Sequence, residues 1–119
     1  MKKAVIYMKQ RVDEPDYITN GRLERCKAFA KQENLEILDI CWDQISNDTR
    51  RLYAFEGLLN DSKEQKFDVI IINTISNVTR SRTKFIEYYK QLRSNNVKLM
   101  SVDGLYIYLE DDYDLGLLQ

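Results

Sequence analysis

The chain has 119 residues, 44% of them hydrophobic, with 18 Lys and Arg against 19 Asp and Glu and with only 1 Pro and 4 Gly. This profile is typical of a single globular domain with its own core, and we expect residues 1–119 to form one domain. The sequence has no His, and Cys26 and Cys41 make no Cys-x-x-Cys pair, which excludes a zinc site, a His general base and a Ser-His or Cys-His dyad. We therefore expect no metal and no other cofactor.

The hydrophobic pattern predicts strands that alternate with helices. In chain order the predicted elements are a strand at 4–8, a loop at 9–19, a helix capped by Thr19 or Asn20 and ending near Gln32, a strand at 35–42, a loop at 43–51, a helix from Leu52 through Leu59, a strand at 67–73, a loop at 76–81, a helix ending near 94–96, a strand at 97–102 and an optional short fifth strand at 105–109. The first apolar run is only five residues long, too short for a signal peptide or a membrane span, so we expect a cytoplasmic protein.

Strands that alternate with helices predict right-handed crossovers and an α/β fold. We expect three layers, with a mostly parallel sheet of four to five strands and helices on both faces. In such sheets ligands bind beyond the carboxyl ends of the strands. The loops at 9–19, 43–51 and 75–82 should therefore converge on one crevice.

The side chains brought to that crevice are mostly cationic. Residues 102–119 hold five acids and no base, which leaves residues 1–101 with 18 bases against 14 acids, a net charge of +4. The candidate phosphate- or DNA-binding residues are Lys9, Arg11, Arg50, Arg51, Arg80 and Arg82. Guanidinium groups and a helix N-terminus both suit phosphate oxygens. The alternative is that these side chains are solvated or pair with Asp43 and Asp48.

Nucleotide sites of the common kinds are not supported. The chain has no Gly-x-Gly-x-x-Gly after its first strand and no Gly-x-x-x-x-Gly-Lys-Ser/Thr. A receiver-type acidic pocket also fails, because the first strand ends in Lys9-Gln10-Arg11 where carboxylates would hold a divalent cation.

Five segments match a known family in order and spacing. They are Tyr7-Met8-Lys9-Gln10-Arg11; Arg22-Leu23-Glu24-Arg25-Cys26-Lys27-Ala28-Phe29-Ala30; Asp43-Gln44-Ile45-Ser46-Asn47 with Arg50-Arg51 and Leu58-Leu59; Lys66-Phe67-Asp68-Val69-Ile70-Ile71 followed by Ser76-Asn77-Val78-Thr79-Arg80-Ser81; and Ser101-Val102-Asp103-Gly104 through Asp114-Leu115-Gly116. Together they resemble the N-terminal catalytic domain of the serine recombinases, the resolvase and invertase family, over nearly the whole chain.

The resemblance implies a degenerate active site. The family's first strand carries Tyr-x-Arg-x-Ser, whose Ser attacks a DNA phosphodiester and forms a covalent phosphoserine link, while arginines stabilise the transferring phosphate. Here Arg11 stands in the nucleophile position, and its guanidinium stays protonated and cannot attack. Lys9 replaces the family's Arg, which removes the planar fork.

At the other family positions, some residues differ from the family and some are the same. Ser76 and Asn77 replace an acidic and a basic residue of the third loop, and Arg22 replaces a Gln. The retained family positions are Asp43, Ser46 and Arg80. No catalytic set is intact.

The resemblance implies a protein related to site-specific DNA recombination, without strand-cleaving activity, that binds DNA phosphates weakly or modulates an active recombinase. One alternative is an active but atypical recombinase, or a fragment of one, that uses Ser46 or Ser81. Another is a non-catalytic interaction module that recruits a protein through Tyr106, Tyr108 and the acidic tail. Arg11 either binds phosphate or pairs with Asp43 and fills the pocket. We expect the chain to lack the family's long dimerisation helix and its DNA-binding domain.

Overall fold

The computed structural model describes residues 1–104. Its elements are β1 (Lys2–Arg11), α1 (Asp16–Gln32), β2 (Leu35–Ile45), α2 (Tyr53–Asp61), the 3-10 turn η1 (Ser62–Glu64), β3 (Val69–Ile72), α3 (Ile75–Val78), α4 (Arg82–Ser94) and β4 (Lys98–Ser101). The optional fifth strand at 105–109, Tyr106, Tyr108 and most of the acidic tail lie outside the described residues.

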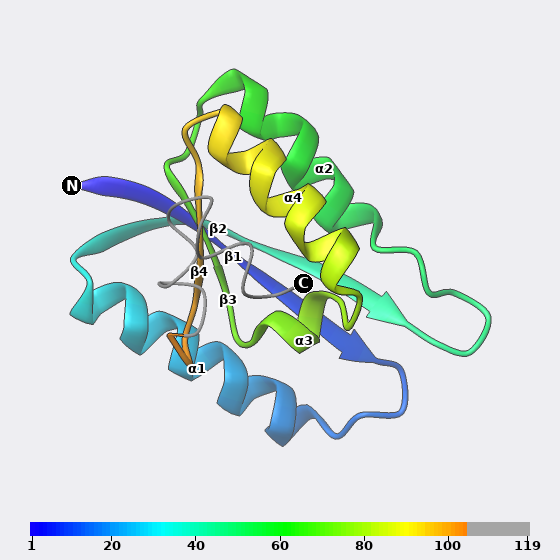
Figure 1. Cartoon of the computed structure of the whole chain (residues 1–119). Coiled ribbons are helices and arrows are strands. Elements are labelled where there is room, and N and C mark those ends of the chain that lie inside the picture. Colours follow the sequence, from blue (N-terminus) through cyan, green and yellow to red (C-terminus); the bar gives the residue numbers. More distant parts are fainter. Residues whose placement is uncertain (105–119) are drawn as a thin grey trace.

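The four strands form one parallel sheet in the order β2-β1-β3-β4. Helix α1 covers one face of this sheet, and α2 and α4 lie side by side over the other (Figure 1). The predicted three-layer α/β fold is confirmed. Parallel strands need crossover connections, and here helices supply them. All loops that lead from a strand to a helix therefore lie on the side of the sheet where the strands end.

Strand β1 separates two cores. Val5 and Tyr7 belong to the core under α2 and α4, whereas Ala4, Ile6 and Met8 belong to the core under α1. All five side chains are buried, which explains why this strand is a continuous apolar run without polar alternation. The strand is therefore held from both sides up to the point where its polar residues begin.

Three helical segments end with a residue in the left-handed region. Asn34 after α1 has φ 59°, Gln65 after η1 has φ 55°, and Asn96 after α4 has φ 61°. Asn tolerates this conformation better than most residues that carry a Cβ. Each of these turns brings the chain back to the edge of the sheet where the next strand begins.

The two strands that lead to the crevice are longer than predicted. The pairing of β1 with β2 continues through Lys9 with Asp43, Gln10 with Gln44 and Arg11 with Ile45. The prediction that loops begin at residues 9 and 43 was therefore wrong by three residues in each case. The polar side chains at these positions suggested loops. A parallel neighbouring strand supplies backbone hydrogen bonds whatever the side chains are, so the strands continue through them.

The start of α1 was also predicted wrongly. The helix begins at Asp16, after Pro15 with φ −61°, a value that Pro presets for the first turn. Thr19 and Asn20 lie inside the helix instead of capping it. The buried Thr19 donates its hydroxyl hydrogen bond to Glu14 at 3.1 Å.

The segment predicted as a loop at 76–81 contains the single turn α3. Thr74 caps this turn, because its Oγ1 accepts a hydrogen bond from the Asn77 amide at 3.2 Å. Ser81 caps α4 in the same way through the Lys84 amide at 3.2 Å. Two short caps thus position the whole connection between β3 and α4.

Candidate functional site

A cavity of about 630 Å³ lies where β1, β2 and β3 end. Its lining residues are Lys9, Arg11, Glu14, Arg22, Ile45, Arg50, Asn73, Thr74, Ser76, Asn77, Thr79 and Arg80. The three loops predicted to converge do so, since each contributes to this lining. We call this cavity the cationic pocket.

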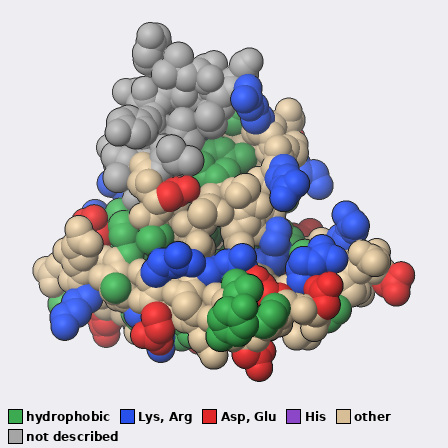
Figure 2. All heavy atoms as spheres, turned by 90° about the horizontal axis from the view of Figure 1, so that it is seen from below, with side chains coloured by type: hydrophobic (Ala, Val, Ile, Leu, Met, Phe, Trp, Pro, Cys, Tyr) green, Lys and Arg blue, Asp and Glu red, His purple; other side chains and the backbone are tan. Residues whose placement is uncertain are grey.

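Positive charge in the cationic pocket is concentrated enough to affect its lysine. Partial burial, followed by the charges of Arg80 and Arg11, lowers the pKa of Lys9 from its ordinary value, against a smaller opposite effect of Asp43. Figure 2 views the molecule from below relative to Figure 1, and Lys and Arg side chains gather toward the right of the face that it shows. In Figure 1, β1 ends at the same side of the molecule. Such repulsion is relieved by a bound anion.

One wall of the pocket is an internal ion pair. Arg22 on α1 donates through Nη1 to Glu14, and both side chains are partly buried. The same Glu14 accepts from Thr19. Arg22 is thereby neutralised, whereas Arg50 and Arg80 have no carboxylate partner within residues 1–104.

Arg11 neither fills the pocket nor pairs with Asp43. Its Nε lies 3.4 Å from the Asp13 carboxylate, and its side chain is 51% exposed. A pair this open to water contributes little, so the guanidinium remains available to an anion in the pocket it lines. Of the two alternatives left open for Arg11, the pairing with Asp43 is therefore not the one observed.

Asp43 is a structural residue. Its carboxylate accepts hydrogen bonds from the Tyr7 hydroxyl at 2.8 Å and from the amides of Ala54 and Phe55 at 2.8 and 3.0 Å. Those amides belong to the first turn of α2, whose cap residue Leu52 offers no side-chain acceptor. Burial, then the hydrogen bond and charge of Asp43, raise the pKa of Tyr7 far above its ordinary value, so this hydroxyl stays a donor.

Three other predicted site residues do not line the cationic pocket. Ser46 Oγ accepts from the amides of Asp48 and Thr49 at 3.2 and 3.1 Å and so shapes a turn. Arg51 bonds to Glu56 at 2.8 Å and lies over the Tyr53 ring, with its guanidinium carbon 4.8 Å from the ring centroid. It lines an adjoining cavity of about 230 Å³ that shares Lys9 and Arg50 with the pocket.

Arg82 faces a different hollow. It lines a cavity with Ile75, Ser81 and Phe85 beside the start of α4. Of the six cationic candidates, the pocket therefore contains four, namely Lys9, Arg11, Arg50 and Arg80.

Glu14 and Asn73 are pocket residues that the sequence analysis did not assign to the site, and Arg22 is one that it named only as a changed family position. Asn73 directly follows β3 and its Nδ2 lies 3.4 Å from the Arg22 carbonyl, which it joins to the end of the strand. Its position after a buried strand was the available signal. For Arg22 the only signal was the resemblance, in which it replaces a family Gln, and its side chain reaches the pocket from the second turn of α1.

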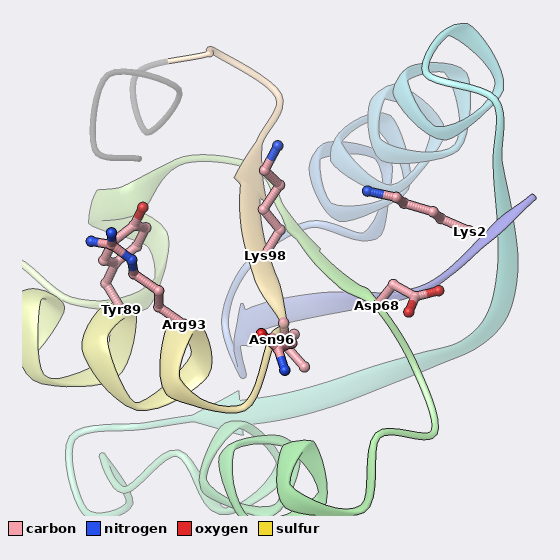
Figure 3. A pocket seen from close by; sticks show the side chains of 7 residues that line it. Lys2, Asp68, Tyr89, Arg93, Asn96 and Lys98 are labelled. Atoms are coloured by element: carbon pink, nitrogen blue, oxygen red, sulfur yellow. The ribbon is translucent and has the colours of Figure 1, made fainter. Parts of the chain in front are cut away.

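A second cavity, of about 330 Å³, lies on the opposite side of the sheet, where β1, β3 and β4 begin. It is lined by Lys2, Asp68, Tyr89, Arg93, Asn96, Val97 and Lys98. Figure 3 shows the charged ends of Asp68, Arg93 and Lys98 pointing in different directions. The charged groups thus do not converge on a common point, in contrast with the cationic pocket.

The described part of the chain has two further properties that bear on function. Within residues 1–104 there is no group of three or more His, Cys, Asp or Glu side chains that could hold a metal ion. In the same range, no helix has both the length and the apolarity needed to cross a membrane.

Comparison with solved structures agrees with the fold. A resolvase family site-specific recombinase from Streptococcus pneumoniae superposes with a TM-score of 0.86 at 19% identity, over 99% of this chain and 83% of that one. The N-terminal catalytic domain of TP901-1 integrase gives 0.79 at 16% identity, over 98% and 91%. The C-terminal catalytic domain of ISC1926 TnpA, an IS607-like serine recombinase, gives 0.71 at 17% identity, over 98% and 94%.

One of the two sequence comparisons found a match and the other did not. No curated protein matches the chain. The family model described as "Resolvase, N terminal domain" matches residues 4–119. With this match and the shared architecture, the chain belongs to the resolvase family of serine recombinases, as a domain of the N-terminal type.

Proposed function

We propose that this serine-recombinase-like domain binds DNA phosphates through its cationic pocket and does not cleave DNA. The observation that carries the proposal is the convergence of Lys9, Arg11, Arg50 and Arg80 on one cavity beyond the strand ends. Family membership relates the chain to site-specific recombination and thus to DNA. Arginine and lysine in such a groove bind phosphate without reading sequence.

The lack of cleavage rests on the groups available as nucleophiles. Arg11, at the position that carries the nucleophilic Ser in the family, has only protonated donor nitrogens. Ser46 and Ser81, the two hydroxyls of the alternative mechanism, are engaged by backbone amides and do not line the pocket. Ser76 does line it, but its Oγ lies 3.2 Å from the Thr74 hydroxyl, which is not a base at neutral pH.

Salt dependence tests the binding half of the proposal. If three phosphates are contacted, affinity for a duplex should fall about 40-fold when salt rises from about 50 to about 200 mM, because each contact releases condensed counterions. Fluorescence anisotropy with a labelled duplex measures this. Absence of binding at the lower salt concentration would refute the proposal.

A trapping experiment tests the catalytic half. On a nicked suicide substrate, an active serine recombinase accumulates a covalent protein-DNA adduct that survives denaturing electrophoresis. We expect no adduct from this chain under conditions in which anisotropy shows the DNA to be bound. A stable adduct would instead support the atypical recombinase, and its loss in the Ser46→Ala, Ser76→Ala or Ser81→Ala variant would identify the hydroxyl.

The lowered pKa of Lys9 predicts opposite effects of alkaline pH on binding and on stability. Lys9 loses its charge at a lower pH than an ordinary lysine with a pKa of 10.5, so DNA affinity should fall as pH rises through its folded-state pKa. Between the folded and unfolded pKa values the unfolded chain binds more protons, so the free energy of unfolding rises over that interval. Anisotropy and chemical denaturation across alkaline pH measure the two. Lys9→Arg, which stays charged, should flatten both profiles, and unchanged profiles in that variant would show that Lys9 is not the group.

A further inference from the structure

The outer edge of β2 is the longest open strand edge in the described part of the chain. Its eleven residues pair with β1 on one side only, and within residues 1–104 no strand pairs on the other (Figure 1). The strand also carries exposed apolar side chains, Leu38 at 45% and Trp42 at 43% exposure. Open edges of this kind are templates for an added strand.

Only part of this strand has regular geometry. The register between β1 and β2 shifts at Ala4 and Val5, which places an irregularity at Leu38. From Asp39 to Ile45 the pairing is unbroken. A strand added to this edge would therefore find seven regular residues, Asp39–Ile45.

Hydrogen bonds show which backbone groups in that stretch point outward. The Ile40 amide donates to its neighbour Asp39 at 2.8 Å instead of to β1. The Ile45 carbonyl accepts from Val12, which follows β1, and so points the opposite way. Because directions alternate along a strand, the backbone groups of Ile40, Trp42 and Gln44 face the open edge.

We propose that a second copy of this chain adds its β2 strand there, antiparallel, about a two-fold axis at Trp42. A two-fold axis perpendicular to the sheet keeps each face of the sheet on its own side, so opposed residues must have the same parity. In this register Trp42 opposes Trp42 of the partner, and Ile40 opposes Gln44. The outward backbone groups then form the hydrogen-bonded pairs of an antiparallel ladder.

Charge and geometry exclude the neighbouring registers. An axis at Cys41 would place Asp39 opposite Asp43, and an axis at Asp39 or Asp43 would place that carboxylate opposite its own copy. Like charges directly opposed destabilise a strand pair. An axis at Ile40 would draw the irregular Leu38 into the ladder. The Trp42 axis alone uses all seven regular residues without opposing two like charges.

The proposed contact places the two Trp42 rings side by side. Trp42 pairs with Met8 in the sheet, and Met8 packs in the core under α1, so both rings lie on the α1 face. Opposed aromatic side chains are among the more stabilising cross-strand pairs. Asp39 must first release the Ile40 amide, and the loss of that hydrogen bond weakens the association and raises the dimer Kd.

Self-association and fluorescence provide the first test. Trp42 is the only tryptophan in the sequence, so its emission should shift to shorter wavelength as analytical ultracentrifugation detects the dimer at rising protein concentration. Gln44→Pro removes an outward amide from each copy and should raise the dimer Kd by about tenfold or more. Trp42→Lys opposes two charges without altering the backbone and should raise it similarly. Tyr17→Gln, which removes another exposed aromatic, should not change it.

Two outcomes of this test would overturn the proposal. One is a monomer throughout the range from micromolar to millimolar protein. The other is a dimer that Gln44→Pro and Trp42→Lys leave unaffected, which would place the contact elsewhere. An emission shift caused only by another protein's added segment would show that the edge serves a different partner, and it would overturn the choice of a second copy.

Cross-linking tests the register. In a Cys41→Ser background, Trp42→Cys should form a covalent dimer on oxidation, because residues in a hydrogen-bonded antiparallel pair have Cα atoms about 5.5 Å apart, within disulfide range. Ile40→Cys is the matched control, since it opposes Gln44 and not itself. Efficient cross-linking of Ile40→Cys in place of Trp42→Cys would overturn the Trp42 axis.

Discussion

Replacing Asp43 by alanine is expected to lower the free energy of unfolding by about 3 kcal/mol or more. The substitution removes three hydrogen bonds at once and leaves the Tyr7 hydroxyl and the Ala54 and Phe55 amides without their acceptor. Tyr7 is buried and packs edge-on against Phe55 with ring centroids 5.0 Å apart, so water cannot easily replace the lost oxygen atoms. Urea denaturation followed by circular dichroism measures the effect.

Two matched variants separate the role of Asp43 in α2 from a general effect of charge. Asp43→Asn keeps one acceptor oxygen and should recover about half of the loss. Asp48→Ala removes an exposed carboxylate from the following loop and should change stability by less than about 0.5 kcal/mol. If Asp43→Ala were as stable as Asp48→Ala, Asp43 would not be the tether between β2 and α2.

The double variant Arg11→Gln, Arg80→Gln is expected to weaken duplex DNA binding about a hundredfold at low salt, roughly tenfold for each charge-assisted contact. Both side chains line the cationic pocket, Arg11 from the end of β1 and Arg80 from the segment between α3 and α4, and both lower the pKa of Lys9. The slope of log affinity against log salt should also become shallower by about 1.8. Anisotropy titrations at several salt concentrations provide both numbers.

Charge alone also affects DNA binding, so the control must remove the same charge elsewhere. Arg25→Gln, Arg93→Gln has the same net charge as the test variant, and neither residue lines the cationic pocket. We expect it to bind within about threefold of the unchanged chain, because exposed charges that do not line the pocket act on the DNA only through a field that salt screens. Equal losses in the two double variants would place the DNA elsewhere on the surface.

The sequence predicted the parts of the fold that depend on burial. The run Val69–Ile72 could only be an interior strand, and the alternation of strands with helices required a parallel sheet with a binding edge. That edge then identified Lys9, Arg11, Arg50 and Arg80 as neighbours, although they lie far apart in the sequence, at the end of β1 and in the segments that follow β2 and β3. Each of these inferences depends on backbone topology, which hydrophobic pattern determines well.

Side-chain direction and local hydrogen bonds were beyond the sequence pattern. Arg50 and Arg51 are adjacent and chemically identical, yet Arg51 turns to Glu56 and Tyr53 while Arg50 lines the pocket. Asp43 appeared as a site residue because the family retains it, whereas its contacts stabilise α2. Such choices depend on partners from other elements, which no local pattern encodes.

The left-handed residues Asn34, Gln65 and Asn96 have a consequence for how this domain can evolve. They end helical segments at the edge of the sheet where the strands begin, while the cationic pocket occupies the opposite edge. Glycine would adopt these conformations with less strain, so a change to glycine at these positions would raise the free energy of unfolding. Substitutions in the pocket that weaken the fold can thus be compensated at a distance, and the binding surface can diverge without loss of the scaffold.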